Sequence, residues 1–191
     1  MRVLLFLLVC VLGAPPAAAQ PVGTNLNVGA WLRQAQALGD NASETAQRRL
    51  ALRLDPNLRQ ACEGDEIDGG VSVMRVDAAN YFVTLQCGMG ARRPIVVPYA
   101  VQHVAGRWRA RRLQVQTFYG GRLGTDATLM GDLEVRGQRI GLFEGMGASE
   151  YLSFTYRLPR IGEPAHLVLL RAEEGEVDGP SRVTYSWPAG Q

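Results

Sequence analysis

Arginine provides the clearest signal for chemistry in this sequence. Arginines alternate with apolar residues in the stretch 107–111, RWRAR, and in a strand this alternation places the three guanidinium groups on one face. Guanidinium groups pair well with carboxylates and phosphates. The functional interpretation is a surface for an acidic ligand or partner, with candidate residues Arg107, Arg109 and Arg111, extended by Arg92 and Arg93 in the nearby loop region. A single alternating stripe is ordinary on an antiparallel sheet, so the favoured interpretation is a solvated face or ion pairs with the acidic second half of the same chain.

The tetrapeptide GMGA occurs twice, at 88–91 and at 145–148. Dinucleotide-binding and P-loop motifs need a helix directly after the glycines, whereas strand-like sequence follows both copies. Glycine in such a place supplies the positive φ of a turn between paired strands. With the copies aligned, apolar residues coincide at Val83/Ile140, Leu85/Leu142, Ile95/Leu152, Val97/Phe154 and Val101/Leu158, and Tyr99 meets Tyr156. The pattern favours two similar hairpins, an internal duplication, over a phosphate-binding loop.

Residues that could support catalysis are few. The chain has two histidines, His103 and His166, and it contains neither an H-E-x-x-H zinc motif nor a G-x-S-x-G nucleophile motif. Carboxylates cluster in 63–68 and 173–178, where solvated loops are the simpler interpretation and calcium is the alternative. We expect no cofactor. A secreted hydrolase remains the alternative function, and it would require a histidine beside a carboxylate in a cleft.

The first nineteen residues resemble a cleaved secretory signal. A charged start precedes the apolar run VLLFLLVCVLG, and an A-x-A end follows at Ala17–Ala19, which is the pattern of such signals. We predict cleavage after Ala19 and no transmembrane segment in the mature chain; a retained anchor is the alternative. All twenty basic residues are arginine, a bias that indicates a GC-rich bacterial genome.

Two cysteines, Cys62 and Cys87, remain after the signal. An even pair in an exported chain favours a disulfide, whereas a redox centre would more often show C-x-x-C and a zinc site would need further ligands. The sequence therefore predicts a structural Cys62–Cys87 bridge.

Helical periodicity is confined to the start of the mature chain. Two short helices are expected, the first with Val28, Trp31, Leu32, Ala35 and Leu38 on one face. The second has Ala42, Ala46, Leu50 and Leu54 on one face and a capping box from Asn41 to Glu44. Both are expected to pack against a sheet.

Period-two patterns follow from Cys62 onward, separated by glycine-rich turns. The expected strands lie near 71–76, 81–87, 94–104, 107–117, 131–135, 138–144, 150–158, 165–172 and 181–187, with a hairpin turn at Arg136-Gly137. Pro98 suggests an edge position or a bulge in its strand. We predict an α+β fold, mainly antiparallel β, sandwich or barrel-like. Its parts are a signal peptide at 1–19, a helical segment at 20–60 and a β domain at 61–191.

The stretch ACEGDEID…VMRVDAANYFVTLQCGMGARRPIVVPYAV resembles a bacterial exported family, the domain-of-unknown-function family 1176. The later LFEGMGA is similar to a second glycine-rich turn of that family, although it lacks a cysteine usual there, and Met89 and Arg92 also depart from the pattern. The resemblance covers about residues 60–190. It implies an exported location and the Cys62–Cys87 bridge, and it implies no activity.

These patterns together predict a secreted or periplasmic, non-catalytic binding module. Its partner would be an envelope component or a protein, and one specific version is a hydrolase inhibitor that presents the hairpin 86–95. The formal net charge is only +2, well short of a nucleic-acid-binding composition. Arginine dominates 20–125 and acidic residues dominate 126–191, an asymmetry that could orient a partner.

Overall fold

The structure is a computed structural model, and it describes residues 22, 25–38, 42–62, 67, 69–89, 93–146 and 149–187. The expected signal peptide lies outside these residues and remains a prediction. Within the described part of the chain, no helix is both long and apolar enough to cross a membrane.

Three helices open the described chain: α1 (Val28–Leu38), α2 (Glu44–Leu54) and the short α3 (Leu58–Ala61). The first two were expected, and α3 was not. The N-cap of α2 is Ser43, whose hydroxyl accepts a hydrogen bond from the Ala46 amide at 3.4 Å. The expected cap at Asn41 is therefore wrong, and Asn41 itself lies outside the described residues. Serine serves equally well because its oxygen reaches the free amides of the first turn.

Twelve strands form two sheets in the described residues. The first sheet has the order β1-β2-β3-β4, with β7 also paired to β3. The second has the order β6-β5-β11-β10-β9-β8, with β12 also paired to β11. The strands are β1 Val71–Arg75, β2 Asn80–Met89, β3 Pro94–Val104, β4 Arg107–Arg112, β5 Gln114–Tyr119, β6 Arg122–Asp126, β7 Leu129–Met130, β8 Asp132–Arg136, β9 Arg139–Gly145, β10 Glu150–Arg157, β11 His166–Glu176 and β12 Ser181–Ser186. All pairings are antiparallel except that of β5 with β11.

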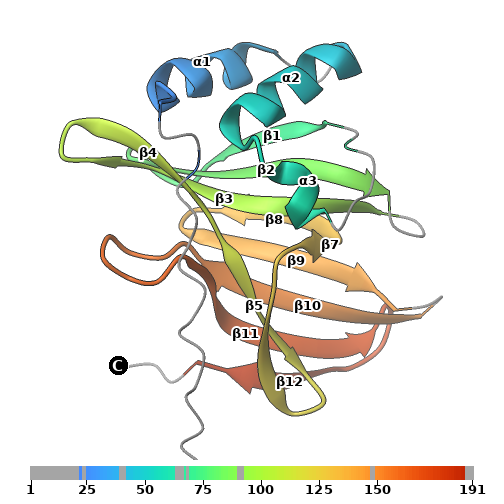
Figure 1. The fold of residues 1–191 in the computed structure, drawn as a ribbon. Helices are drawn as coiled ribbons and strands as arrows, with labels where there is room; N and C mark the ends of the chain where they lie inside the picture. The colour runs from blue at the N-terminus through green and yellow to red at the C-terminus, as the bar shows by residue number, and fades with distance from the viewer. Residues whose placement is uncertain are drawn as a thin grey trace, which may run out of the picture.

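The helices, the first sheet and the second sheet lie as three successive layers (Figure 1). One core joins the helices to the first sheet and includes Trp31, Leu54 and Leu85. A second core lies between the sheets and includes Phe82 and Phe154. The predicted α+β fold is confirmed as a sandwich, since the sheets do not close on one another. The first sheet is covered on both faces, which explains the runs of consecutive buried residues in β2 and β3.

The predicted strand 107–117 is divided between the sheets. β4 belongs to the first sheet and β5 to the second, and Leu113, which is fully buried, lies at the crossing. Pro98 lies in β3, an interior strand, where it was expected at an edge or a bulge. Along this edge of β3, Pro98 lies between the residues that pair with β7 and those that pair with β4. Its carbonyl accepts a 2.9 Å hydrogen bond from the Leu113 amide, and no backbone N–H is needed from residue 98 there.

The two GMGA copies connect paired strands, β2 with β3 and β9 with β10. The pairs Val83↔Tyr99 and Ile140↔Tyr156 occupy equivalent places, so the two hairpins have the same register in this region. Their surroundings differ, because the matched apolar face packs on the helices in the first hairpin and on the opposite sheet in the second. The two hairpins are thus alike in how their strands pair, but they differ in what they pack against. Residues 90–92 and 147–148 lie outside the described residues.

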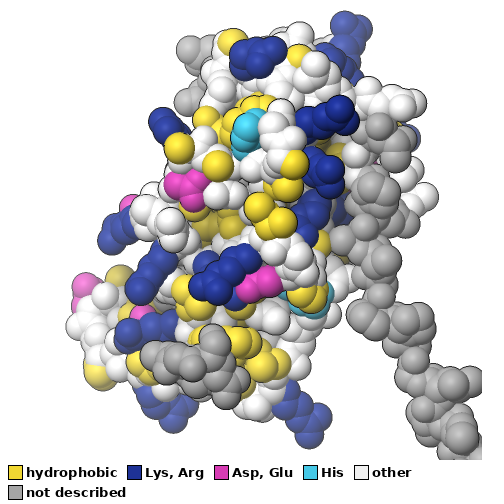
Figure 2. Space-filling model, turned by 90° about the vertical axis from the view of Figure 1, so that its left-hand side faces the viewer, with side chains coloured by type: hydrophobic (Ala, Val, Ile, Leu, Met, Phe, Trp, Pro, Cys, Tyr) yellow, Lys and Arg dark blue, Asp and Glu magenta, His cyan; other side chains and the backbone are white. Residues whose placement is uncertain are grey.

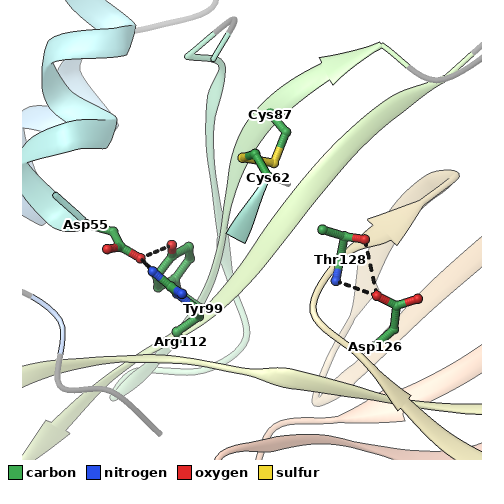
Figure 3. Close-up of a disulfide and its surroundings, with 7 residues drawn as sticks. All are labelled: Asp55, Cys62, Cys87, Tyr99, Arg112, Asp126 and Thr128. Carbon is green, nitrogen blue, oxygen red and sulfur yellow. Dashed lines mark hydrogen bonds and ion pairs between the residues drawn. A yellow bond between two sulfur atoms is a disulfide. The ribbon is translucent and has the colours of Figure 1, made fainter. Parts of the chain in front are cut away.

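The predicted disulfide is confirmed. Cys62 and Cys87 are bonded, with their Cα atoms 5.4 Å apart, and the bond joins the end of α3 to β2 (Figure 3). Both cysteines are buried in the core beneath the helices.

Candidate functional site

The structure divides the predicted arginine surface into separate places, and Arg92 lies outside the described residues. Arg93 forms an ion pair with Asp132 and donates a 3.1 Å hydrogen bond to the Phe143 carbonyl. Its guanidinium carbon also lies 5.9 Å from the centre of the Phe143 ring. Arg93 follows the first GMGA, whereas these partners belong to the second sheet. Its interactions therefore join the two sheets. Arg93 thus follows the interpretation in which an arginine pairs with the acidic second part of the same chain.

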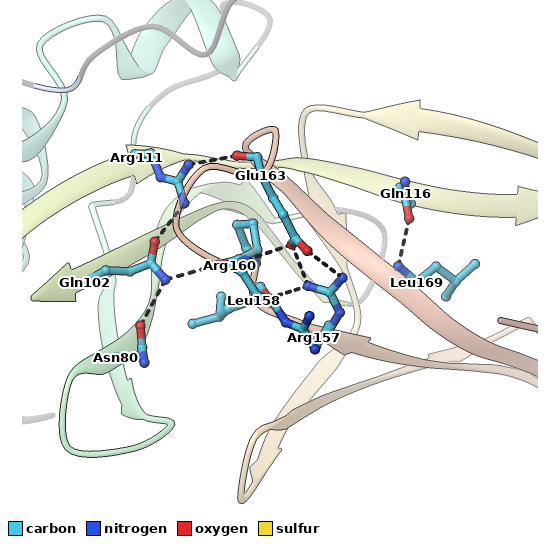
Figure 4. A network of polar contacts seen from close by, with 10 residues as sticks. Asn80, Gln102, Arg111, Gln116, Arg157, Leu158, Arg160, Glu163 and Leu169 are labelled. Atoms are coloured by element: carbon cyan, nitrogen blue, oxygen red, sulfur yellow. Dashed lines mark hydrogen bonds and ion pairs between the residues drawn. The ribbon is translucent and has the colours of Figure 1, made fainter. Parts of the chain in front are cut away.

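Arg111 is also engaged within the protein. Its guanidinium donates 2.7 Å to the Gln102 side-chain oxygen and 3.1 Å to the Glu163 carbonyl (Figure 4). Partial burial lowers the pKa of Arg111, while Glu163 opposes this shift. The carboxylate of Glu163 is held by Arg157 at 2.7 and 3.1 Å, and the hydrogen bond from Arg157 is the main cause of the lowered pKa of Glu163. These contacts fix the connection between β10 and β11 onto the first sheet.

Arg107 and Arg109 behave differently. Both side chains are exposed on β4, and neither makes a hydrogen bond or ion pair with another described residue. On the end of the molecule seen in Figure 2, arginine side chains are spread over the surface and acidic side chains are few. Of the four candidate arginines that the structure describes, Arg107 and Arg109 are therefore exposed and without partners in the described chain.

A hollow of about 610 Å³ lies where the start of α1 meets the β3–β4 turn. Arg107 and Trp108 line it from β4, and Arg33, Asn25 and Asn27 line it from α1 and the residues before it. No carboxylate is among its described lining residues. Arg33 is exposed and, like Arg107, has no hydrogen-bonding or ionic partner in the described chain. Two unpaired guanidinium groups thus border one hollow that also offers two side-chain amides.

Trp108 forms the aromatic part of this end of the sheet. Its ring centre lies 5.5 Å from that of Tyr81 and 5.0 Å from that of His103. A Cβ built on Gly29 of α1 would lie 2.9 Å from the indole Cδ1, so the absence of a side chain there permits the helix to approach the indole. This close approach brings Arg33 to the hollow, and no sequence signal could have placed this helix over Trp108.

The hydrolase alternative requires a histidine beside a carboxylate. In the described residues, His103 packs on Trp108, and neither its side chain nor that of His166 has a hydrogen-bonding or ionic partner. Of the acidic segments, residues 63–66 and 68 lie outside the described chain, and Glu173 and Glu174 pair with Arg171 and Arg182. The described residues contain no group of three potential metal ligands.

Replacement of Arg93 by alanine separates a structural role from a binding role. We expect Arg93→Ala to lower the free energy of unfolding by about 1 kcal/mol, since one exposed ion pair and one charged hydrogen bond are lost. The matched variant Arg109→Ala should change it by less than about 0.5 kcal/mol. Urea denaturation measures both values, and equal stability of the two variants would contradict the structural role of Arg93.

The fold and the bridge define this chain as a disulfide-bonded α+β sandwich with a cationic hollow at one end. Comparisons with protein-family models, with curated proteins and with solved structures found no match. The resemblance to the domain-of-unknown-function family 1176 therefore stays a prediction.

Proposed function

We propose that this protein is an exported, non-catalytic binding module that holds an anionic ligand in the hollow between α1 and the β3–β4 turn. The observation that carries the proposal is the pair Arg33 and Arg107. Both border the same hollow, both lack partners in the described chain, and no described carboxylate lines the hollow with them.

The chemistry of the hollow favours a particular class of ligand. Guanidinium groups bind carboxylate and phosphate oxygens through paired hydrogen bonds, and the amides of Asn25 and Asn27 add donors. The indole of Trp108 offers a flat apolar surface with a polar edge. An acidic saccharide, with a negative group and a ring that can lie against an aromatic face, satisfies all three features. Such ligands are components of bacterial envelopes, which agrees with the predicted export.

Export is part of the proposal. It is supported by the signal-like sequence at 1–19 and by the buried disulfide, since disulfides persist mainly in oxidising compartments. Mass spectrometry of the secreted or periplasmic protein tests it, and a chain that retains residues 1–19 would contradict the predicted cleavage.

Titration with defined saccharides tests the binding. An oligogalacturonate should bind and a neutral dextran of similar length should not, as measured by calorimetry. The double variant Arg33→Ala/Arg107→Ala should weaken oligogalacturonate binding at least tenfold, equivalent to about 1.4 kcal/mol. Binding should also weaken as salt rises, because exposed charges are screened.

The control is Arg139→Ala, which removes another exposed arginine from β9 in the second sheet, one that has no hydrogen-bonding or ionic partner in the described chain. It should leave the affinity unchanged. Equal binding of dextran, or equal losses in both variants, would overturn the proposal. A preference for a DNA oligonucleotide over the saccharide would also contradict it, because the composition predicts no nucleic-acid partner.

A further inference from the structure

A second cavity, of about 220 Å³, lies between the two sheets at the end that carries both GMGA hairpins. Ile95, just after the first GMGA, lines it from β3, and Glu144, just before the second, lines it from β9. Further lining residues come from β5, β6, β7 and β10. The β3–β4 turn with its cationic hollow lies at the opposite end of the sandwich (Figure 1).

The polar lining of this cavity has unused capacity for hydrogen bonding. Tyr156 is 1% exposed and lines the cavity, yet its hydroxyl makes no hydrogen bond with another described residue. Tyr119 donates a weak 3.3 Å bond to the carboxylate of Glu144. Asp126 accepts bonds at 3.1 and 3.4 Å from the amide and hydroxyl of Thr128 (Figure 3). No fully buried side-chain nitrogen or oxygen among the described residues lacks a hydrogen-bond partner, so the Tyr156 hydroxyl is open to the cavity, where a ligand can bond to it.

The charge of the lining is negative. Asp126 and Glu144 both contribute carboxylates, and no arginine or histidine lines the cavity among the described residues. Arg93 is close enough to act on Glu144 electrostatically, but its guanidinium is held by Asp132 and the Phe143 carbonyl. Burial raises the pKa of Glu144, because the carboxylate loses hydration. A cation in the cavity would replace the interaction that water no longer supplies.

The remaining walls are apolar, formed by Ile95, Val115, Leu129, Met130 and Leu142. Tyr119 and Met130 are 48% and 47% exposed, which places the entrance beside them. An occupant must therefore combine one positive group with hydrogen-bond donors and a short hydrocarbon part. A bare divalent ion matches this lining poorly, since the lining has only two carboxylates and the described residues contain no group of three His, Cys, Asp or Glu side chains that could hold a metal ion.

We propose that the cavity between the sheets binds a primary ammonium group on a short alkyl chain, with Glu144 and Asp126 as counter-charges and the Tyr156 hydroxyl as a hydrogen-bond acceptor. Two sources share this chemistry: a free alkylamine and a lysine side chain. This sequence contains no lysine, so a lysine would come from another protein. The site is independent of the anion-binding function proposed for the opposite end.

Ligand pairs that differ only in charge test the proposal on the unmodified protein. Butylammonium should shift the NMR signals of residues around Tyr156 and Glu144 in a saturable manner, whereas neutral butanol at the same concentration should bind at least tenfold more weakly. Equal binding of the two compounds would overturn the proposal, because an apolar cavity alone would then explain it. A peptide Gly-Lys-Gly that binds more tightly than butylammonium identifies a partner's lysine, and the reverse order identifies a free amine.

Two substitutions locate the site. Glu144→Gln should weaken butylammonium binding at least tenfold, and Tyr156→Phe, which preserves the buried ring, should weaken it severalfold. The matched control Glu134→Gln removes a carboxylate that is exposed on β8 and paired with Arg136, and it should have no effect. If Glu144→Gln does not fold, Tyr156→Phe decides. Unchanged affinity in Tyr156→Phe, or displacement of butylammonium by equimolar Ca²⁺, would refute the assignment.

Discussion

Asp55→Ala is expected to lower the free energy of unfolding by about 3 kcal/mol, the lower end of the cost of breaking a buried ion pair. Asp55 is 3% exposed and follows directly after α2. One of its carboxylate oxygens accepts bonds from the Tyr99 hydroxyl at 2.6 Å and from Nε of Arg112 at 2.8 Å (Figure 3). The other accepts a 2.9 Å bond from the Asn57 amide. The lower end applies because 20% of the Arg112 side chain remains exposed and water can solvate it in part.

The physical cause lies in the groups that the substitution leaves behind. Tyr99 is fully buried, and burial, followed by the charge of Asp55, raises its pKa well above the ordinary value. Without the Asp55 carboxylate, the Tyr99 hydroxyl and the Arg112 guanidinium lose their shared hydrogen-bond acceptor. Both groups would still be packed between helix and sheet residues. The end of α2 would therefore lose the ion pair and hydrogen bond that attach it to β3 and β4 of the first sheet.

Urea denaturation followed by tryptophan fluorescence measures this loss. The control Glu134→Ala breaks an exposed pair with Arg136 and should cost less than about 1 kcal/mol. A double-mutant cycle uses Asp55→Ala, Arg112→Leu and the variant that carries both substitutions. It gives the coupling free energy between the two side chains. A coupling near zero, or a loss from Asp55→Ala no larger than that of the control, would contradict the assigned role.

Removal of the disulfide is the second large effect. Cys62→Ala/Cys87→Ala should lower the free energy of unfolding by about 3 to 4 kcal/mol, because the bond closes a loop of 25 residues in the unfolded chain. Alanine is the suitable replacement, since both cysteines are buried among apolar residues and a serine hydroxyl there would lack a partner.

The same variant supplies its own control. A reducing agent should destabilise the native protein to the level of the double variant and leave the double variant unchanged. The double variant, where folded, should still bind oligogalacturonate, because neither cysteine lines the hollow at the β3–β4 turn. A native protein insensitive to reductant in its denaturation curve would mean that the bridge contributes nothing to stability.

The fold class, the bridge and the paired hairpins could be predicted from sequence, because each depends on a local pattern. Periodicity identifies strands such as β10, and an even cysteine pair indicates a bond. The strands β6 and β7 were missed for reasons visible in the structure. All residues of β6 are exposed, so no buried face gives it an apolar alternation, and β7 has only two residues.

The candidate site was predicted only in part. Alternation placed Arg107 and Arg109 correctly on one exposed face. It gave Arg111 the same role, and nearness in sequence added Arg93, although both have partners in the protein. Apart from Gln102 in the neighbouring strand β3, those partners lie far away in sequence, in β8, in β9 and in the connection after β10. Arg33 was missed because its place beside Trp108 depends on how α1 packs on the first sheet, which no pattern within a single strand or helix reports.

The crossing of the chain at Leu113 has a consequence for how the protein loses its structure. Because β4 continues into β5, a single covalent segment is a member of both sheets, and the residue at the crossing is buried in the core between them. Neither sheet can unfold alone unless the β4–β5 segment is also pulled out of the other sheet. The first and second sheets should accordingly unfold in one cooperative step, with amide protons in the two sheets exchanging with solvent at comparable rates.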